Sequence, residues 1–93
     1  MPRQAKRTDA EVALQAATAT TIVPAGACQS TCVVQNKSAT DTVFMTTDGS
    51  VPSANNGMEL APKTGYEFPE DALPRDAVRV FSTGTPRVYA TYA

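Results

Sequence analysis

Alternation of apolar and polar residues is the dominant pattern of the chain from residue 18 onward. Runs with a period of two are typical of β-strands that bury one face, and turn-forming clusters every ~8–12 residues are typical of an all-β sandwich or barrel. The alternation predicts strands over residues 18–23, 31–36, 41–47, 57–60, 64–68, 77–82 and 87–92. We therefore expect an all-β fold, an antiparallel β-sandwich of about seven strands that is jelly-roll-like or immunoglobulin-like.

The same alternation predicts which side chains face the interior of the sandwich. A slip of one residue would turn the whole apolar set of a strand to solvent, so the two faces can be assigned strand by strand. The predicted core consists of Ile22, Cys32, Val34, Val43, Met45, Met58, Leu60, Tyr66, Phe68, Val78, Val80, Val88 and Ala90. Phe44, Phe81 and Tyr89 then face outward, either as contacts for another chain or as isolated surface residues.

Residues 1–17 lack this alternation and form a separate region of the sequence. They are polar and basic up to Thr8 and rich in alanine afterwards, and in the alanine-rich part Val12 and Leu14 are the only large apolar side chains. The sequence Thr-Asp-Ala-Glu at 8–11 fits a capping box and favours one or two helical turns, whereas the alternative is an extended arm. We expect an N-terminal arm over residues 1–17, extended or helical, and a β-sandwich domain over residues 18–93.

Length and charge narrow the possible functions. A chain of 93 residues suffices for one domain with one modest core. Its formal net charge of −1, from eight basic and nine acidic residues, gives no overall signature of nucleic-acid or membrane binding. Arg3, Lys6 and Arg7 precede every acidic residue, so residues 1–7 are basic and the rest of the chain is acidic. No apolar run approaches the ~20 residues that span a bilayer and no signal peptide is evident, so we expect a cytoplasmic chain.

Side chains that commonly carry catalysis or bind metals are scarce. The chain has no histidine, no glycine-rich phosphate loop and no Gly-x-Ser-x-Gly or Cys-x-x-Cys motif. Cys28 and Cys32 are expected to be free thiols, with Cys32 in the core. The acidic residues between positions 67 and 76 match no ion-binding loop and are interpreted as a solvated loop. The sequence predicts no catalytic, cofactor-binding or metal-binding residue; an enzyme that uses carboxylates alone is the remaining catalytic alternative.

Short segments of the predicted strands resemble a group of known proteins. The segments are TIVPA at 21–25, VVQNKS at 33–38, TVFM at 42–45, GMELAP at 57–62 and VYAT at 88–91. Together they resemble the strand motifs of small β-sandwich proteins encoded among the structural genes of tailed bacteriophages. The resemblance covers about residues 20–92, whereas the cysteine pair and the acidic 69–76 segment depart from the pattern. It implies a non-enzymatic virion component, such as a capsid decoration or cement protein or another small head or tail protein.

Two functions follow from this resemblance and from the outward side chains. In the first, the protein is a decoration protein of the virion, assembled in the host cytoplasm, that binds on or between major capsid subunits in many copies and stabilises the shell. In the second, it is a surface- or carbohydrate-binding module of a phage tail or other assembly. Neither function requires a cofactor, nucleic acid or membrane. The expected partner-binding residues are Arg3, Lys6, Arg7, Val12 and Leu14 in the arm, and Phe44, Phe81 and Tyr89 on the outward faces.

Overall fold

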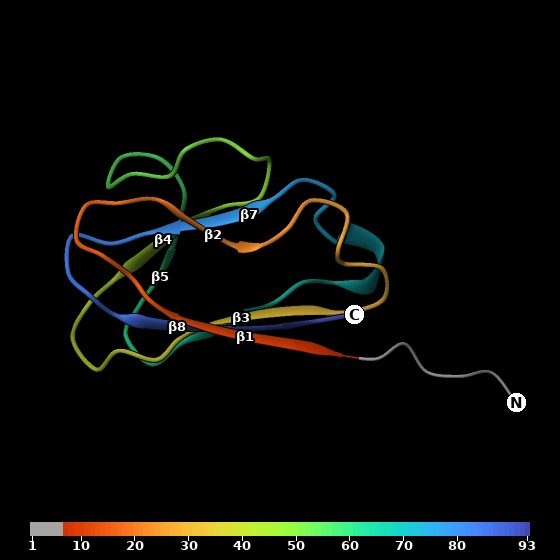
Figure 1. Ribbon diagram of the computed structural model, residues 1–93, viewed down its shortest axis with the longest axis horizontal. Coiled ribbons are helices and arrows are strands. Elements are labelled where there is room, and N and C mark those ends of the chain that lie inside the picture. Colours follow the sequence, from red (N-terminus) through yellow and green to blue (C-terminus); the bar gives the residue numbers. More distant parts are fainter. Residues whose placement is uncertain (1–6) are drawn as a thin grey trace, which may run out of the picture.

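Two four-stranded antiparallel sheets face each other across an apolar core in the computed structural model, which describes residues 7–93 (Figure 1). The elements of this part of the chain are β1 (Thr8–Ala13), β2 (Thr20–Val23), β3 (Cys32–Asn36), β4 (Val43–Thr46), β5 (Met58–Leu60), β6 (Gly65–Glu67), the 3-10 turn η1 (Glu70–Ala72), β7 (Val78–Phe81) and β8 (Arg87–Tyr92). Sheet A has the order β1-β8-β3-β6 and sheet B the order β2-β7-β4-β5. The predicted all-β sandwich is confirmed, with eight strands in place of seven among the described residues.

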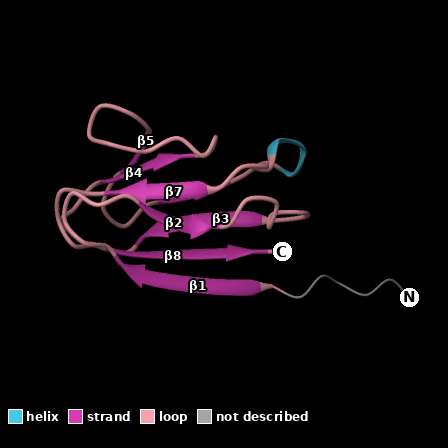
Figure 2. Ribbon diagram, turned by 45° about the horizontal axis from the view of Figure 1, so that its top comes forward, coloured by secondary structure: helices cyan, strands magenta, loops and turns pink. Residues whose placement is uncertain are grey.

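Connections between the strands cross repeatedly from one sheet to the other. Within residues 7–93, β4 and β5 are the only consecutive strands that lie in the same sheet. Strands far apart in sequence therefore become neighbours, and β1 pairs with β8 along its whole length, from Thr8 opposite Tyr92 to Ala13 opposite Arg87 (Figure 2). The described helical content is the three-residue turn η1, and no described helix could cross a bilayer.

The core agrees with most of the predicted inward set. Buried apolar residues are Leu14, Ile22, Val23, Cys32, Val34, Val43, Met45, Leu60, Phe68, Val78, Val80, Val88 and Ala90. The predicted register of β3 is confirmed, because Val34 is fully buried whereas Val33 faces outward and is half-buried. Burial, together with the neighbouring Cys28, raises the pKa of the Cys32 thiol, and both cysteines are free as predicted.

Four residues depart from the predicted core. Met58 is 42% exposed and Tyr66 is half-buried, because each lies on a short strand at the edge of its sheet. The Tyr66 ring still packs edge-on against Phe68, with ring centroids 4.8 Å apart. Val23 is buried in addition to Ile22 because a β-bulge interrupts the pairing of β2 with β7 between Thr21 and Val23. The fourth, Leu14, belongs to the N-terminal segment.

The N-terminal segment is not helical in its described part. Thr8–Ala13 forms β1, an edge strand of sheet A, so the helical alternative for the arm is wrong for these residues. Leu14 is only 2% exposed and its backbone N–H donates to the carbonyl oxygen of Pro86 at 2.8 Å. The capping-box pattern is overridden because the ladder with β8 satisfies the backbone of β1 and because Leu14 reaches the core. The sandwich therefore includes residues that the sequence pattern assigns to an arm.

Candidate interaction surfaces

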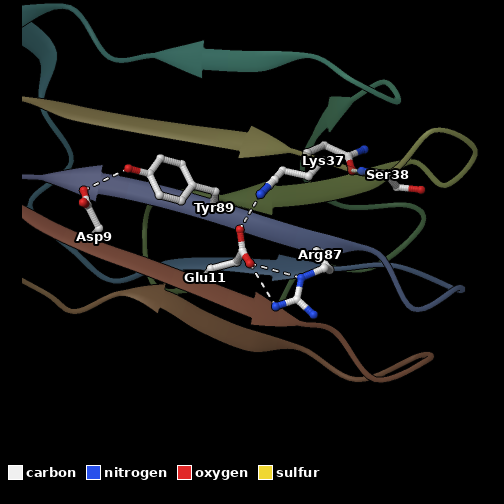
Figure 3. Close-up of polar contacts among 7 residues, drawn as sticks. Asp9, Glu11, Lys37, Ser38, Arg87 and Tyr89 are labelled. Carbon is white, nitrogen blue, oxygen red and sulfur yellow. Dashed lines mark hydrogen bonds and ion pairs between the residues drawn. The ribbon is translucent and has the colours of Figure 1, made fainter.

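The outer face of sheet A carries a connected set of polar side chains (Figure 3). Alternation along β1 turns Asp9 and Glu11 outward, and alternation along β8 turns Arg87 and Tyr89 outward beside them. Lys37 follows β3 and joins the set from the other side of β8, where its backbone N–H donates to the carbonyl oxygen of Arg87 at 2.9 Å. Three segments that are distant in sequence thus meet at one place on this face.

Glu11 is the centre of this set. Its Oε1 accepts a hydrogen bond from Lys37 Nζ at 2.6 Å, and its Oε2 accepts from Arg87 Nε at 3.1 Å and Nη2 at 2.9 Å. Lys37 and Arg87 together hold the pKa of the Glu11 carboxyl below its ordinary value. Both Arg87 donors reach the same oxygen, Oε2, so Oε1 remains available to Lys37. Glu11 therefore clamps the edge strand β1 to β8 and to the end of β3.

Replacement of Glu11 by glutamine is expected to lower the melting temperature at neutral pH by a few degrees at most, because exposed ion pairs are weak. A carboxyl whose pKa is depressed in the folded state stabilises above its unfolded pKa, and this contribution disappears as the pH falls through the folded pKa. The difference between the native protein and Glu11→Gln should therefore shrink as the pH falls below the ordinary glutamate pKa of ~4.3, and disappear once the pH is below the lowered pKa of Glu11 in the folded protein. Thermal melts across this pH range test it. Glu59→Gln, at an exposed position of β5, is the control, and an equal loss there would contradict the clamp.

Tyr89 is tied to the same face by its hydroxyl group. The hydroxyl donates to Asp9 Oδ1 at 2.9 Å, and this bond raises the pKa of Tyr89. The side chain faces outward, as alternation predicts, but it is only partly exposed. Tyr89 thus contributes to holding β1 in place as well as to the outer surface.

The outer face of sheet B carries the two other outward aromatic residues. Phe44 on β4 and Phe81 on β7 are directly opposite each other in the ladder, and their ring centroids are 6.5 Å apart at a tilt of 49°. Both rings are half-buried and neither packs against the main core. The predicted outward orientation is confirmed for both. Because Tyr89 lies on sheet A, however, the three aromatic residues occupy opposite outer faces and form no common platform.

The predicted partner-binding residues of the arm are divided by the structure. Arg7 is exposed at the start of the described chain, whereas Arg3 and Lys6 lie outside the described residues. Val12 is half-buried and packs against the core, and Leu14 is buried within it. While β1 stays in its sheet, Leu14 is inaccessible and Val12 faces the interior. Neither side chain is therefore placed to contact a partner, in contrast to the prediction from the sequence.

Two features were missed by the sequence interpretation. Asn36, predicted as the last residue of the 31–36 strand but not as part of the core, is fully buried at the end of β3. The second feature is a pocket of about 260 Å³ beside the β4–β5 connection, lined by Met45, Thr46, Thr47, Asp48, Ser50, Asn56, Gly57 and Met58. For Asn36 a signal was available, since it has the same alternation parity as Cys32 and Val34. For the pocket no signal was available in the sequence, because Asp48-Gly49-Ser50 and Asn55-Asn56-Gly57 are sequences typical of turns.

Neither a metal-binding group nor a known relative assigns a function to these surfaces. Within residues 7–93, no group of three or more histidine, cysteine or acidic side chains is placed to hold a metal ion. Comparisons with protein-family models, with curated proteins and with solved structures find no match to this chain.

Proposed function

We propose that the protein is a structural component of a phage virion, a capsid decoration or cement protein that binds on or between major capsid subunits and stabilises the shell. The sequence resemblance supports this proposal, because its segments coincide with β2, β3, β4, β5 and β8 and so draw on both sheets. The role requires no catalysis. The expected partner is the major capsid protein or another virion protein, contacted by many copies of this chain.

The strand order is the structural observation that best fits this role. We propose that the sandwich is a jelly roll, because eight strands divided four and four, with β1 beside β8 in one sheet and β2 beside β7 in the other, fit that architecture. An immunoglobulin-like constant domain would have seven strands divided four and three. Jelly rolls recur in viral capsid proteins, lectins and cupins, so the fold is compatible with the proposed role and with carbohydrate binding without deciding between them.

The arrangement of the aromatic residues favours the capsid role over carbohydrate binding. A sugar-binding surface built from Phe44, Phe81 and Tyr89 would need the three rings on one face, whereas they lie on the outer faces of two opposed sheets. The Tyr89 hydroxyl is also engaged by Asp9. The basic N-terminal residues, by contrast, precede β1 and are not needed for the described ladder with β8.

In the proposed role the basic N-terminal residues act as a tether that holds the domain on the particle. Removing residues 1–7 tests this tether and leaves the sandwich intact, since the deletion stops before Thr8, where β1 begins. The shortened protein should keep its melting temperature but co-sediment with intact phage particles about tenfold less tightly, because three positive charges that steer and hold it on an acidic shell are lost. Binding of the full-length chain should also weaken with added salt, because exposed charges are screened beyond ~8 Å at physiological ionic strength.

The control for this experiment removes positive charge from the body of the domain. Lys63 and Arg75 are both exposed, and the double replacement Lys63→Ala with Arg75→Ala should leave particle binding unchanged. Absence of the full-length protein from purified particles would refute the virion role altogether. Unchanged binding after the deletion would refute the tether while leaving the virion role in place. Retention on an immobilised polysaccharide that is lost on Tyr89→Ala would favour the carbohydrate-binding alternative.

A further inference from the structure

The connection between β4 and β5 is a long loop that is ordered by its own hydrogen bonds. Thr46 Oγ1 donates to the carbonyl oxygen of Ser50 at 2.7 Å, and Asn56 Nδ2 donates to that of Val51 at 3.0 Å. Ser53 and Asn56 exchange backbone hydrogen bonds of 2.9 Å and 3.1 Å within the loop. Figure 1 shows the loop standing out beyond sheet B, on the side away from sheet A. It is therefore a preformed projection, so a partner would not have to order it on binding.

The junction of this loop with β5 is fixed by glycine. Gly57 has φ +129°, and a Cβ atom there would lie 3.0 Å from the carbonyl oxygen of Met45. The backbone of the loop end consequently passes closer to β4 than a side chain would permit. Gly57 and Met45 are both part of the pocket wall, so this close approach also shapes the pocket.

Exposed apolar side chains are concentrated at this loop. Val51 is 61% exposed and Met58 is 42% exposed, and within the described residues they are the only exposed large hydrophobic side chains. Met58 forms part of the pocket wall, and Val51 follows Ser50, another lining residue. Methionine is enriched at the centres of protein interfaces, where its flexible thioether adapts to the partner. A rigid loop that exposes both side chains is better suited to a protein partner than to solvent alone.

The charge of the pocket is negative. Asp48 Oδ1 accepts from the Ser50 hydroxyl at 2.6 Å and from the Ser50 backbone N–H at 3.0 Å, and these bonds lower the Asp48 pKa. Asp48 is the only charged residue among those that line the pocket. None of the lining residues is basic. Arg79, opposite Thr46 in the ladder, is the basic residue of this sheet face, but it is not part of the pocket wall.

We propose that the pocket between the β4–β5 loop and β5 is a docking site for a lysine or arginine side chain of a protein partner. The cationic group would pair with the Asp48 carboxylate, and its aliphatic stem would lie against Met58. The volume of about 260 Å³ is below the ~300–1,000 Å³ of small-molecule sites and suits a single side chain. This inference does not depend on the proposed virion role, and its test requires no particles.

Titration of the full chain with single-residue probes, followed by the backbone amide signals in NMR spectra, tests this site. The probes are Nα-acetyl-lysine amide and Nα-acetyl-norleucine amide, which has a similar alkyl chain without the charge. The lysine probe should produce saturable shifts centred on residues 45–58, which include every pocket-lining residue, and should bind at least about tenfold more tightly than the norleucine probe. Asp48→Asn should weaken lysine binding by about tenfold, whereas Glu67→Gln, an exposed acid on β6 in the other sheet, should have no effect.

Three results would overturn the proposal. They are equal binding of the two probes, shifts that map away from the pocket-lining residues, and the absence of any saturable shift with the lysine probe. Should Asp48→Asn alter the loop itself, the comparison of charged and neutral probes on the unmodified protein still decides the outcome. The salt dependence provides a further readout on the unmodified protein, because the affinity for the lysine probe should fall as ionic strength rises and that for the norleucine probe should not.

Discussion

Deleting residues 1–16 is expected to unfold the domain. The deletion removes the whole of β1, so β8 loses the neighbour that it pairs with over six positions and becomes an edge strand. It also removes Leu14 from the core, a change that alone costs about 2–5 kcal/mol when a leucine is truncated to alanine. A domain of this size is stable by only about 5–14 kcal/mol, at ~0.05–0.15 kcal/mol per residue. Far-UV circular dichroism and a thermal melt would detect the loss.

A matched pair of point substitutions separates the contribution of the core from that of the strand. Leu14→Ala should lower the free energy of unfolding by about 2–5 kcal/mol, whereas Gln15→Ala, at the exposed neighbouring position, should change it by less than about 0.5 kcal/mol. The chain that lacks only residues 1–7 serves as the control for the deletion of residues 1–16. If the chain without residues 1–16 melts as the full chain does, β1 is a dispensable appendage and the residues before 18 do act as an arm.

The sandwich could be predicted from the sequence because its strands from β2 to β8 obey local alternation. The first strand could not be predicted in the same way, since alanine at 10 and 13 gives little apolar contrast and the Thr-Asp-Ala-Glu sequence favours a helix start. What decides its structure is the open edge of β8, a feature that exists only after the other strands are paired. Local propensity is weak against such tertiary pairing, so β1 is determined by its neighbour and not by its own sequence.

For the candidate surfaces, the alternation of residues along a strand predicts only which side chains face outward. It assigns Phe44, Phe81 and Tyr89 correctly to outward positions, but it cannot show that Tyr89 lies on a different sheet from the other two. Glu11 and Arg87 are 76 positions apart, and their contact depends on the pairing of the first described strand with the last. Sequence patterns contain no register for strands that are so far apart, so the clamp on sheet A was not foreseen.

Asn36, at the end of β3, shows how one polar residue can hold the two sheets together. Its side chain is fully buried, and Nδ2 donates to the carbonyl oxygens of Asp41 at 2.8 Å, Leu60 at 3.0 Å and Ala61 at 3.3 Å. Its Oδ1 accepts from the backbone N–H of Ser38 at 3.0 Å. One amide thus joins the end of β3 in sheet A to the chain that leaves β5 in sheet B, and it satisfies carbonyl groups that water would otherwise have to reach.

Replacement of Asn36 by aspartate is expected to lower the free energy of unfolding by at least about 3 kcal/mol, on the order of a quarter or more of the total. The change preserves size but places an oxygen where an amide N–H group now faces three carbonyl oxygens, so attraction becomes repulsion and a charge is buried without a partner. Denaturant titration of both proteins measures the difference. Gln35→Asp, at the exposed adjacent position of β3, introduces the same charge and should cost less than about 1 kcal/mol. Equal losses at the two positions would show that the amide of Asn36 is not the link between the sheets and that β3 tolerates a carboxylate equally on either face.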